Sequence, residues 1–347
     1  MKVIQLGPVP PPHGGVQHNL MAIHRLLLQR GHCARMINIT RFRKTDDDAV
    51  YSPRNWFQLL VLLLRLKCDI VHLHIGGSVT PRLLALSLGC CMMPRRKAVL
   101  TFHSGGYPDS REGQSARPCS MRGFVFRRFE RIIAVNSQIM EIFFKFGCKP
   151  DRVQLIYPFA LEDAAQDYSL PENLSAFIES HYPVMMTVGL LEPEYDLTLQ
   201  IETLGLLREK YPRIGLMIVG SGSLEGALRK EISAKPYACD ILVCGDTPHR
   251  HTLGAMRACA IFLRTTLFDG DSVAVREAIH SGIPVIATNT GSRPPGVHLI
   301  HSPNPAMLAQ AIEEVLGRPA SSQNAGEANN DNIEAVLRIY KDLLGEH

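Results

Sequence analysis

Short apolar runs alternate with amphipathic stretches along nearly the whole chain, and this alternation limits its fold more than any other feature. Runs of five or six mostly apolar residues are typical of strands buried on both faces, and amphipathic stretches are typical of the helices that cover them. The pattern predicts parallel strands joined by crossover helices. We expect strands at 2–7, 34–39, 69–74, 98–103, 131–136 and 152–157 in the first half, and at 184–189, 215–220, 240–245, 260–265 and 284–288 in the second.

Single residues predict where several helices begin and end. A helix is expected over 16–30 because Gly31, which can adopt the left-handed conformation, follows it. Ser137 is expected to cap a second helix that ends near Gly147. Asp271 or Ser272 is expected to cap a third.

The alternation breaks at residues 158–174 (PFALEDAAQDYSLPENL), which read as a linker. A chain of 347 residues is long enough for two domains, each with its own core. We therefore expect domains over 1–165 and 166–325. After a polar, low-complexity stretch, residues 326–347 contain one more amphipathic helix.

The cysteines and the apolar segments indicate the compartment. The nine cysteines form no C-x-x-C pair, and an odd set scattered through apolar segments is typical of buried thiols in a reducing compartment. Four prolines within the first 12 residues stand where a signal peptide has its apolar core. The longest apolar run, 56–66, is too short to span a bilayer and contains Arg65. We expect a cytoplasmic protein.

The net charge of +4 is distributed unevenly. Residues 1–180 carry 23 Lys and Arg against 14 Asp and Glu, a net charge of +9, whereas residues 181–347 carry a net charge of −5. A basic first half suits an anionic partner such as a membrane surface, a phosphorylated lipid or a nucleic acid. A solvated basic face without a partner explains the same numbers. If the partner is a membrane, the protein is peripheral on its inner face.

Two glycine-rich turns follow predicted strands. Gly14 and Gly15 precede the first helix in LGPVPPPHGGVQ, and bare backbone amides at a helix N-terminus bind anions. The second turn, VGSGSLEGAL, spans 219–228. Neither turn is G-x-G-x-x-G and no acid closes the second strand, so a dinucleotide fingerprint is absent. Glycine after a strand is also ordinary packing chemistry, and both interpretations stay open.

Three histidines lie on predicted strands of the first half. His72 and His74 alternate along one strand and share a face, which suits a metal ion, but no third ligand follows at a recognisable spacing. A structural role is favoured for these two. His103 ends the fourth strand in TFHSGG, at the carboxyl edge where sites of parallel sheets form, and we expect it to be functional.

The stretch DGDSVAVREA, residues 269–278, sets Asp269 and Glu277 eight positions apart around a predicted helix start. Acids before a helix can simply match its dipole. In the functional interpretation, Asp269 and Glu277 border a site and accept hydrogen bonds from sugar hydroxyls. These residues alone do not decide between the two interpretations, and the rest of the chain is needed.

These landmarks, in this order, resemble the retaining nucleotide-sugar glycosyltransferases of the GT-B fold, in particular family 4 (group 1). The family pattern is Glu, seven residues, Glu, a small-residue stop and G-x-P-V-x-A-T; here it reads Asp269, seven residues, Glu277 and GIPVIAT at 282–288. The resemblance runs to about residue 317 and implies an α/β protein with two Rossmann-like, doubly wound parallel-sheet domains facing a central cleft. Further matching segments are GG at 14–15, DIVHLH at 69–74, TFHSGG at 101–106, VGLLEPE at 188–194, LMIVGSG at 216–222 and VCGDTP at 243–248.

The resemblance also implies roles. The first domain faces the acceptor, the second binds the nucleotide sugar, and the last helix returns to the first domain. Glu277 binds the ribose, Asp269 and His103 face the transferred sugar, and neither a cofactor nor a metal ion is expected. The glycines at 14 and 15 approach the diphosphate, and the turn 245–247 faces the base. The residues implied for donor binding are Gly14, Gly15, Gly189, Gly245, Asp246, Thr247, Asp271, Ser272, Glu277 and Arg293.

One departure from the family bears on catalysis. The family has Arg and Lys in the first loop of the second domain, where they neutralise the leaving diphosphate, and the matching positions here are Leu190 and Tyr195. Losing two cations that face a developing double charge costs several kcal/mol of transition-state stabilisation. Either Arg264, Arg276 or Arg293 substitutes, or activity is impaired; Arg264, at a strand end, is the expected catalytic cation.

The resemblance implies transfer of a sugar from a nucleotide-sugar donor to a saccharide or lipid-linked acceptor, with retention, in polysaccharide or glycolipid biosynthesis. The partners implied are the donor, the acceptor and an anionic membrane surface, with no nucleic acid. A nucleotide-sugar epimerase of the same architecture and a sugar-nucleotide-binding homologue without turnover are the alternatives. Product analysis without acceptor separates the first alternative, and retained nucleotide binding without transfer identifies the second.

Overall fold

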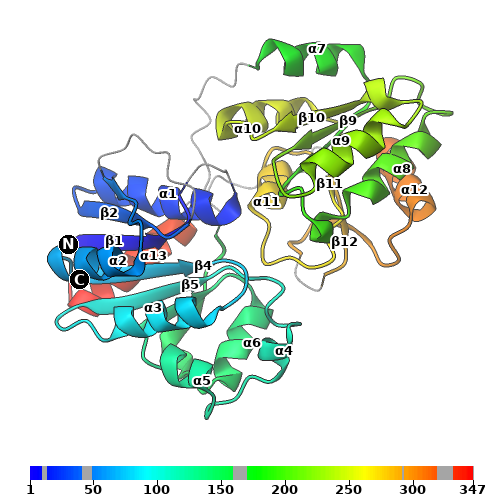
Figure 1. The fold of residues 1–347 in the computed structure, drawn as a ribbon. Helices are drawn as coiled ribbons and strands as arrows, with labels where there is room; N and C mark the ends of the chain where they lie inside the picture. The colour runs from blue at the N-terminus through cyan, green and yellow to red at the C-terminus, as the bar shows by residue number, and fades with distance from the viewer. Residues whose placement is uncertain (10–13, 41–48, 159–169, 291–292, 319–330, 347) are drawn as a thin grey trace. The chain divides into compact units, whose positions relative to one another are not determined.

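The computed structural model describes residues 1–9, 14–40, 49–158, 170–290, 293–318 and 331–346. Contacts divide the chain into two compact units (Figure 1). The first unit holds Met1–Ala160, Asp269–Asp271 and Asn329–His347, and the second holds Leu161–Phe268 and Ser272–Ala328. The expected domain boundaries at 165 and 325, and most of the expected linker, lie outside the described residues.

The first unit is built on a seven-stranded, all-parallel sheet with the strand order β3-β2-β1-β4-β5-β6-β7. Its strands are β1 (Lys2–Gly7), β2 (Cys33–Asn38), β3 (Val50–Tyr51), β4 (Ile70–Ile75), β5 (Lys97–Phe102), β6 (Arg131–Ala134) and β7 (Val153–Leu155). Its helices are α1 (Gly15–Gln29), α2 (Trp56–Arg65), α3 (Pro81–Cys91), α4 (Arg111–Gln114), α5 (Met121–Phe126), α6 (Ser137–Lys145) and α13 (Asp331–Leu344).

Alternation along the strands divides the core of the first unit into two layers. Val71 and Leu73 of β4 pack with α2, α3, α5 and α6 on one face of the sheet. Ile70 of β4 and Val99 of β5 pack with α1 and α13 on the other face (Figure 1). Because side chains alternate with a period of two, His72 and His74 point to the layer that α1 and α13 form. The last helix therefore belongs to the core of the first unit, where Tyr340 is fully buried.

The second unit is built on a six-stranded, all-parallel sheet with the order β10-β9-β8-β11-β12-β13. Helices α8, α9 and α12 cover one face, and α7, α10 and α11 cover the other. Its strands are β8 (Val184–Val188), β9 (Gly215–Val219), β10 (Ile241–Gly245), β11 (Ile261–Arg264), β12 (Val285–Thr288) and β13 (His298–Ile300). Its α-helices are α7 (Glu172–Ser180), α8 (Leu197–Leu207), α9 (Glu225–Ser233), α10 (His249–Ala258), α11 (Val273–His280) and α12 (Pro305–Leu316).

Two doubly wound parallel sheets, each with helices on both faces, confirm the fold class expected from the alternation. The predicted strands are present, although those expected over 131–136, 152–157 and 260–265 are shorter by two or three residues. The edge strands β3 and β13 were not predicted, because two and three residues are too few to show a period. In the part of the chain that the structure describes, no helix is long and apolar enough to cross a membrane.

The expected helix ends are confirmed with one exception. Gly31, with φ of +73°, follows α1, and Ser272 caps α11 through its side chain. The expectation that Ser137 caps α6 is wrong. Asn136 is the cap, because its side-chain oxygen accepts from the backbone N–H of Ile139 over 2.8 Å, and Ser137 is the first helical residue.

Candidate functional site

The strand order of the second sheet reverses between β8 and β11, which are neighbours in the sheet. In the sequence they are separated by 72 residues, 189–260, which include β9 and β10. At such a switch the loops after the two strands lead to opposite faces, and ligands bind beyond the carboxyl ends. Gly189 follows β8, and Arg264 ends β11. The candidate site of the second unit lies at this edge.

The glycine-rich turn after β9 is explained by backbone packing. Gly220 has φ of +133°, and a Cβ on it would lie 1.8 Å from the carbonyl oxygen of Gly189. A Cβ on Gly222 would lie 2.5 Å from the carbonyl oxygen of Leu191. The loops after β8 and β9 therefore touch backbone to backbone, which only glycine allows at these positions. Of the two interpretations of this turn, the structure supports packing.

Arg264 lies against the aromatic ring of Tyr195. The side chain of Arg264 is buried, and its Nη1 donates a hydrogen bond to the carbonyl oxygen of Val188 over 2.9 Å. Its Cζ lies 4.7 Å from the centroid of the Tyr195 ring. A guanidinium over a ring face is attracted by the ring quadrupole, which offsets part of the cost of burying the charge. A positive charge is thus held beside position 195, although the residue at that position is neutral.

The residue after Arg264 fixes the backbone of the same tyrosine. Thr265 Oγ1 donates to the carbonyl oxygen of Tyr195 over 3.0 Å. Gln200 Nε2 in turn donates to Thr265 Oγ1 over 2.7 Å. Asp196, which follows the tyrosine, has a left-handed backbone with φ of +45°. The end of β11 therefore holds both the ring and the main chain of Tyr195.

Arg293 donates hydrogen bonds to residues at or just after the ends of β11 and β12. Its Nε donates to the carbonyl oxygen of Thr288 over 3.0 Å, and its Nη2 donates to Thr266 Oγ1 over 2.7 Å. Thr288 Oγ1 donates to the carbonyl oxygen of Thr266 over 2.5 Å. The structure thus brings two of the three expected arginines, Arg264 and Arg293, to ordered positions at one edge of the second sheet. Arg276 lies half-buried on α11.

A buried carboxylate on α11 is paired with a histidine on α10. Glu277 is 7% exposed, and its Oε1 lies 2.8 Å from His249 Nε2. His249 is the first residue of α10 and is half-buried. A carboxylate accepts several hydrogen bonds, so pairing with His249 is compatible with further donors such as hydroxyl groups. Within the second unit, Glu277 and His249 are also two groups of the kind that bind metal ions, but two ligands alone do not define a metal site.

The turn that joins β10 to α10 lies at the same edge of the sheet. Gly245 has φ of +72°, and its carbonyl oxygen accepts from the backbone N–H of Gly220 over 2.9 Å. Thr247 Oγ1 donates to the same carbonyl oxygen over 3.3 Å. Asp246 between them is exposed. The turn expected to face a base is therefore an ordered loop with an exposed acid.

The histidines of the first unit form a chain of contacts at the carboxyl ends of β4 and β5. His72 Nε2 lies 2.7 Å from Thr101 Oγ1, and its Nδ1 lies 2.5 Å from the hydroxyl oxygen of Tyr340. His74 Nδ1 lies 3.3 Å from His103 Nε2, and these two rings are stacked. Both ring nitrogens of His72 are engaged by hydroxyl groups, which supports the structural role favoured for it over metal binding.

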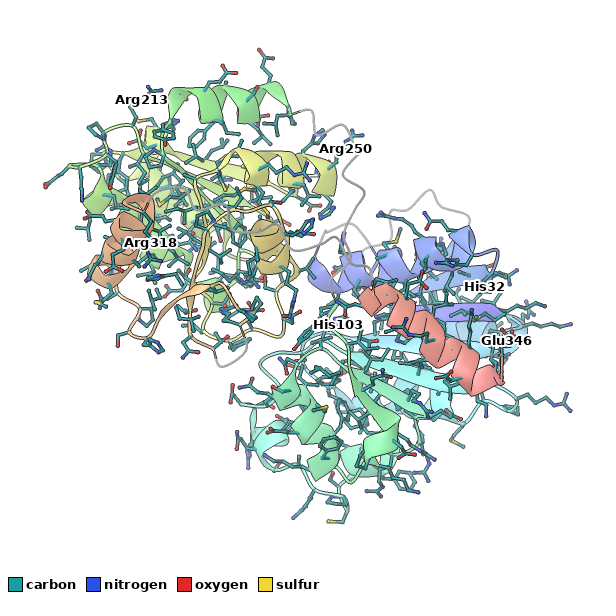
Figure 2. All side chains as sticks on the ribbon, turned by 180° about the vertical axis from the view of Figure 1, so that it is seen from behind. His32, His103, Arg213, Arg250, Arg318 and Glu346 are labelled. Atoms are coloured by element: carbon teal, nitrogen blue, oxygen red, sulfur yellow. The ribbon has the colours of Figure 1, made fainter. Side chains whose placement is uncertain are left out.

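Burial keeps these histidines neutral. Desolvation lowers the pKa of His72 to about 3, with a smaller contribution from His103. Desolvation also lowers the pKa of His103 to about 3 and that of His74 well below its usual value. His103, which follows β5 (Figure 2), therefore offers a neutral imidazole at physiological pH. It can hydrogen-bond to a sugar, but it cannot supply the positive charge absent from positions 190 and 195.

The remaining expected residues group with the first unit. Gly14 is the extended residue before α1, and Gly15 is the first residue of α1. The preceding residues 10–13 lie outside the described residues. Asp269 and Asp271 group by their contacts with the first unit. There, Asn136 Nδ2 donates to the carbonyl oxygen of Gly270 over 2.6 Å.

Sequence reasoning missed His249 and the part that Tyr195 plays. His249 could have been noticed because it begins a helix after a strand, in VCGDTPH, at the edge where sites form. At Tyr195 the sequence predicts the loss of a cation, and nothing in it indicates that the ring lies against the guanidinium of Arg264.

Two family models match the chain. The model described as Glycosyltransferase Family 4 matches residues 13–160, and the model described as Glycosyl transferases group 1 matches residues 175–331. Together they account for most of both units. A search of curated protein sequences found no match.

Solved structures with the same fold include three glycosyltransferase-related proteins. HepE of Anabaena in complex with UDP-glucose is 16% identical, with a TM-score of 0.68 and coverage of 99% of each chain. A glycosyltransferase from Rickettsia africae is 18% identical, with a TM-score of 0.66 and full coverage of both chains. WaaG, a glycosyltransferase involved in lipopolysaccharide biosynthesis, is 13% identical, with a TM-score of 0.65 and coverage of 99% of this chain and 100% of WaaG. At these identities the likeness shows the fold.

Proposed function

The chain belongs to the GT-B glycosyltransferases whose halves those two family models describe, and we propose that it transfers a sugar from a nucleotide-sugar donor to a saccharide or lipid-linked acceptor with retention of configuration. The observation that carries the proposal is the set of charged side chains at the carboxyl edge of the second sheet. Two ordered guanidinium groups and a buried carboxylate gather there. Cations suit a diphosphate, and a carboxylate suits the hydroxyls of a ribose.

Arg264 and Arg293 take the charge-neutralising role in this proposal. A departing nucleoside diphosphate develops negative charge, and preorganised donors stabilise that charge with little reorganisation. Both arginines are held by hydrogen bonds to strand ends, so their positions are set before the substrate binds. Their two positive charges serve in place of a divalent metal ion, and we therefore propose a reaction that needs neither metal nor cofactor.

Glu277 binds the ribose, and the pair it makes with His249 is the support for this assignment. A carboxylate that a neighbour already orients loses less entropy when it accepts a hydrogen bond. The rest of the donor site is proposed on the resemblance: the turn 245–247 for the base, and Gly14, Gly15, Gly189, Asp271 and Ser272 for the remainder of the donor. His103 and Asp269 are proposed to bind the transferred sugar, and the neutral state of His103 suits hydrogen bonding to hydroxyls.

The proposed reaction is a same-face substitution. The bond from the anomeric carbon to the diphosphate oxygen breaks, and the acceptor oxygen forms its bond on the same face of an oxocarbenium-like centre. The proton of the acceptor hydroxyl passes to the leaving diphosphate. The protein supplies positive charge and orientation, and no side chain forms a covalent bond to the sugar.

We propose an acceptor at an anionic membrane surface, in polysaccharide or glycolipid assembly, with the protein in the cytoplasm and peripheral to the membrane. The net charge of +9 on residues 1–180 supports this partner. The involvement of WaaG in lipopolysaccharide biosynthesis makes a glycolipid-like acceptor a reasonable first choice.

A thermal-shift screen against nucleotide sugars tests the donor. Uridine nucleotides come first because HepE is solved with UDP-glucose. Analysis of the products with and without acceptor tests the reaction: transfer with the same anomeric configuration supports the proposal. Release of an altered sugar without acceptor would indicate the epimerase instead. Binding without any turnover would indicate the impaired homologue that Leu190 and Tyr195 leave open.

A further inference from the structure

Helix α2 presents an apolar face to solvent. Trp56 is 50% exposed, Phe57 72%, Leu60 41% and Leu64 64%, although the helix has only ten residues. Positions 56, 60 and 64 follow one another at intervals of four, and 57 lies beside them, so the four side chains share one face. Leu59 and Leu63 point the other way and pack in the core. The helix is therefore apolar on both sides, and one side has no partner within the described residues.

Cations flank α2 in the sequence, and one more contacts its backbone. Arg54, Arg65 and Lys67 are exposed before, at the end of and after the helix, and Arg96 Nη1 donates to the carbonyl oxygen of Leu63. Residues 49–68 contain no acid. The preceding residues 41–48 hold three basic and three acidic residues and add no net charge.

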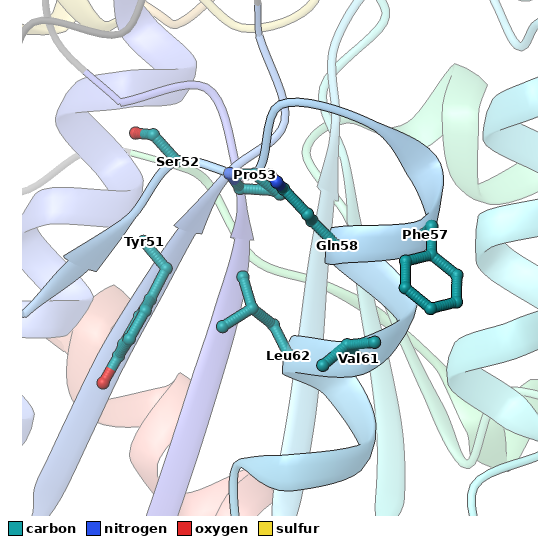
Figure 3. A pocket seen from close by; sticks show the side chains of 7 residues that line it. All are labelled: Tyr51, Ser52, Pro53, Phe57, Gln58, Val61 and Leu62. Carbon is teal, nitrogen blue, oxygen red and sulfur yellow. The ribbon is translucent and has the colours of Figure 1, made fainter.

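A pocket continues the apolar surface beside the helix. It has a volume of about 360 Å³ and lies between the end of β3 and α2 (Figure 3). Phe57 belongs both to the exposed face and to the wall of the pocket, which Tyr51, Pro53, Val61 and Leu62 also line.

We propose that α2 docks this protein on an anionic lipid bilayer, lying in the plane of the interface with Trp56, Phe57, Leu60 and Leu64 inserted. A helix with an apolar face and a rim of Arg and Lys is the kind of element that binds such an interface, and tryptophan favours the headgroup level. Ten residues cannot span the hydrocarbon region. A second copy of the chain fits less well, because two such faces in contact would bring like charges together.

This assignment deepens the membrane part of the proposed function, but its test needs neither donor nor acceptor. Trp56 is the one tryptophan of the chain, so its fluorescence reports on α2 alone. With vesicles of phosphatidylglycerol and phosphatidylcholine, the emission of the full-length protein shifts to shorter wavelength and brominated acyl chains quench it. Vesicles of phosphatidylcholine alone bind about tenfold or more weakly, since each cation near an anionic surface adds severalfold to the affinity.

The double variant Phe57→Ser with Leu64→Ser removes inserted surface at two exposed positions. Its affinity for anionic vesicles falls at least about tenfold, because the buried apolar area is lost. Met121→Ser is the matched control in the basic half, at 67% exposure on α5, and Leu206→Ser is the control in the second unit, at 54% exposure. Both controls bind vesicles like the wild type.

Three results would overturn the proposal. One is an unshifted Trp56 emission on anionic vesicles, and another is loss of binding in Met121→Ser but not in the α2 variant. The third is self-association without lipid that the α2 variant abolishes, which would assign the face to a second copy. Nucleotide binding, followed by thermal shift in the same variants, stays at the wild-type level, so failure of the docking proposal is distinct from failure of the proposed function.

Discussion

The guanidinium of Arg264 lies over the ring of Tyr195, with its Cζ 4.7 Å from the ring centroid. Arg264 is the last residue of β11, and Tyr195 is the last residue of the short 3-10 helix Pro193–Tyr195. Position 195 carries a tyrosine where the resemblance implies a cation, and the guanidinium from β11 lies over the ring of that tyrosine. Under the proposed function, Arg264 supplies the positive charge that the resemblance implies at position 195.

Arg264→Ala should slow the transfer step by about 2–4 kcal/mol in activation free energy, the range for losing one preorganised stabilising group. Steady-state kinetics with the donor that the screen identifies measure this loss. Arg318→Ala is the matched control, because Arg318 is exposed after α12 and carries the same charge in the same unit. An Arg264→Ala enzyme within twofold of wild type would reject Arg264 and favour Arg293.

Variants of Tyr195 should separate its ring from its hydroxyl. Tyr195→Phe keeps the aromatic face and should retain nearly full activity. Tyr195→Leu removes a cation–π contact worth about 0.5–2 kcal/mol and should lower kcat/KM by about two- to thirtyfold. Tyr195→Lys in the Arg264→Ala background should recover part of the lost activity by restoring a cation at position 195. A double variant no better than Arg264→Ala would show that position 195 does not face the leaving group.

Glu277→Gln should weaken nucleotide-sugar binding by about 1.5–3 kcal/mol, the contribution of hydrogen bonds to a charged group. The fold should persist, because glutamine has the same shape and can still bond to His249. Isothermal calorimetry with the donor measures the change. Glu313→Gln, which alters an exposed ion pair with Lys210, should leave affinity unchanged. Equal affinities of Glu277→Gln and wild type would remove the ribose-binding role.

Acid should destabilise the first unit through its buried histidines. In the unfolded chain, His72 takes up a proton below a pH of about 6.5. In the folded state, the same imidazole stays neutral until the pH falls to its lowered pKa of about 3. The unfolded state thus binds more protons in this window, so the unfolding free energy falls as the pH falls through it, by up to about 1.4 kcal/mol per pH unit for this histidine.

Urea unfolding followed by Trp56 fluorescence, at about pH 7.5 and about pH 5, measures that fall for the unit that contains the tryptophan. His72→Gln should reduce the acid-induced loss by about 2 kcal/mol. Tyr340→Phe, which removes the hydroxyl next to His72 but keeps the imidazole, should lower stability and leave the pH dependence in place. Equal pH dependence of wild type and His72→Gln would show that this histidine does not remain neutral in the folded state.

The alternation of apolar runs predicted both sheets because every central strand is buried on two faces and reads as a continuous apolar segment. The edge strands escaped prediction because β3 and β13 are only two and three residues long. The cap of α6 lies one residue earlier than predicted, because Asn136 and Ser137 are both good caps and only the geometry selects between them.

The positions of single residues were predictable where the local pattern carried the signal, as for His103 and Arg264 at strand ends and Glu277 on a helix. The site was not predictable where two distant segments meet. His249 and Glu277 are 28 residues apart, and their contact depends on how α10 packs beside α11. Tyr340 and His72 are 268 residues apart, and no local pattern links a C-terminal helix to one strand of the first sheet.

Arg264 is the residue proposed to stabilise the diphosphate, and calorimetry with a nucleoside diphosphate and the matching monophosphate tests this role most directly. Wild-type protein should bind the diphosphate more tightly than the monophosphate. Arg264→Ala should lose at least about tenfold of that preference, since a charge-assisted hydrogen bond contributes about 1.5–3 kcal/mol, while its affinity for the monophosphate changes little. An unchanged preference for the diphosphate in Arg264→Ala would contradict the relocation of charge from position 195 to β11.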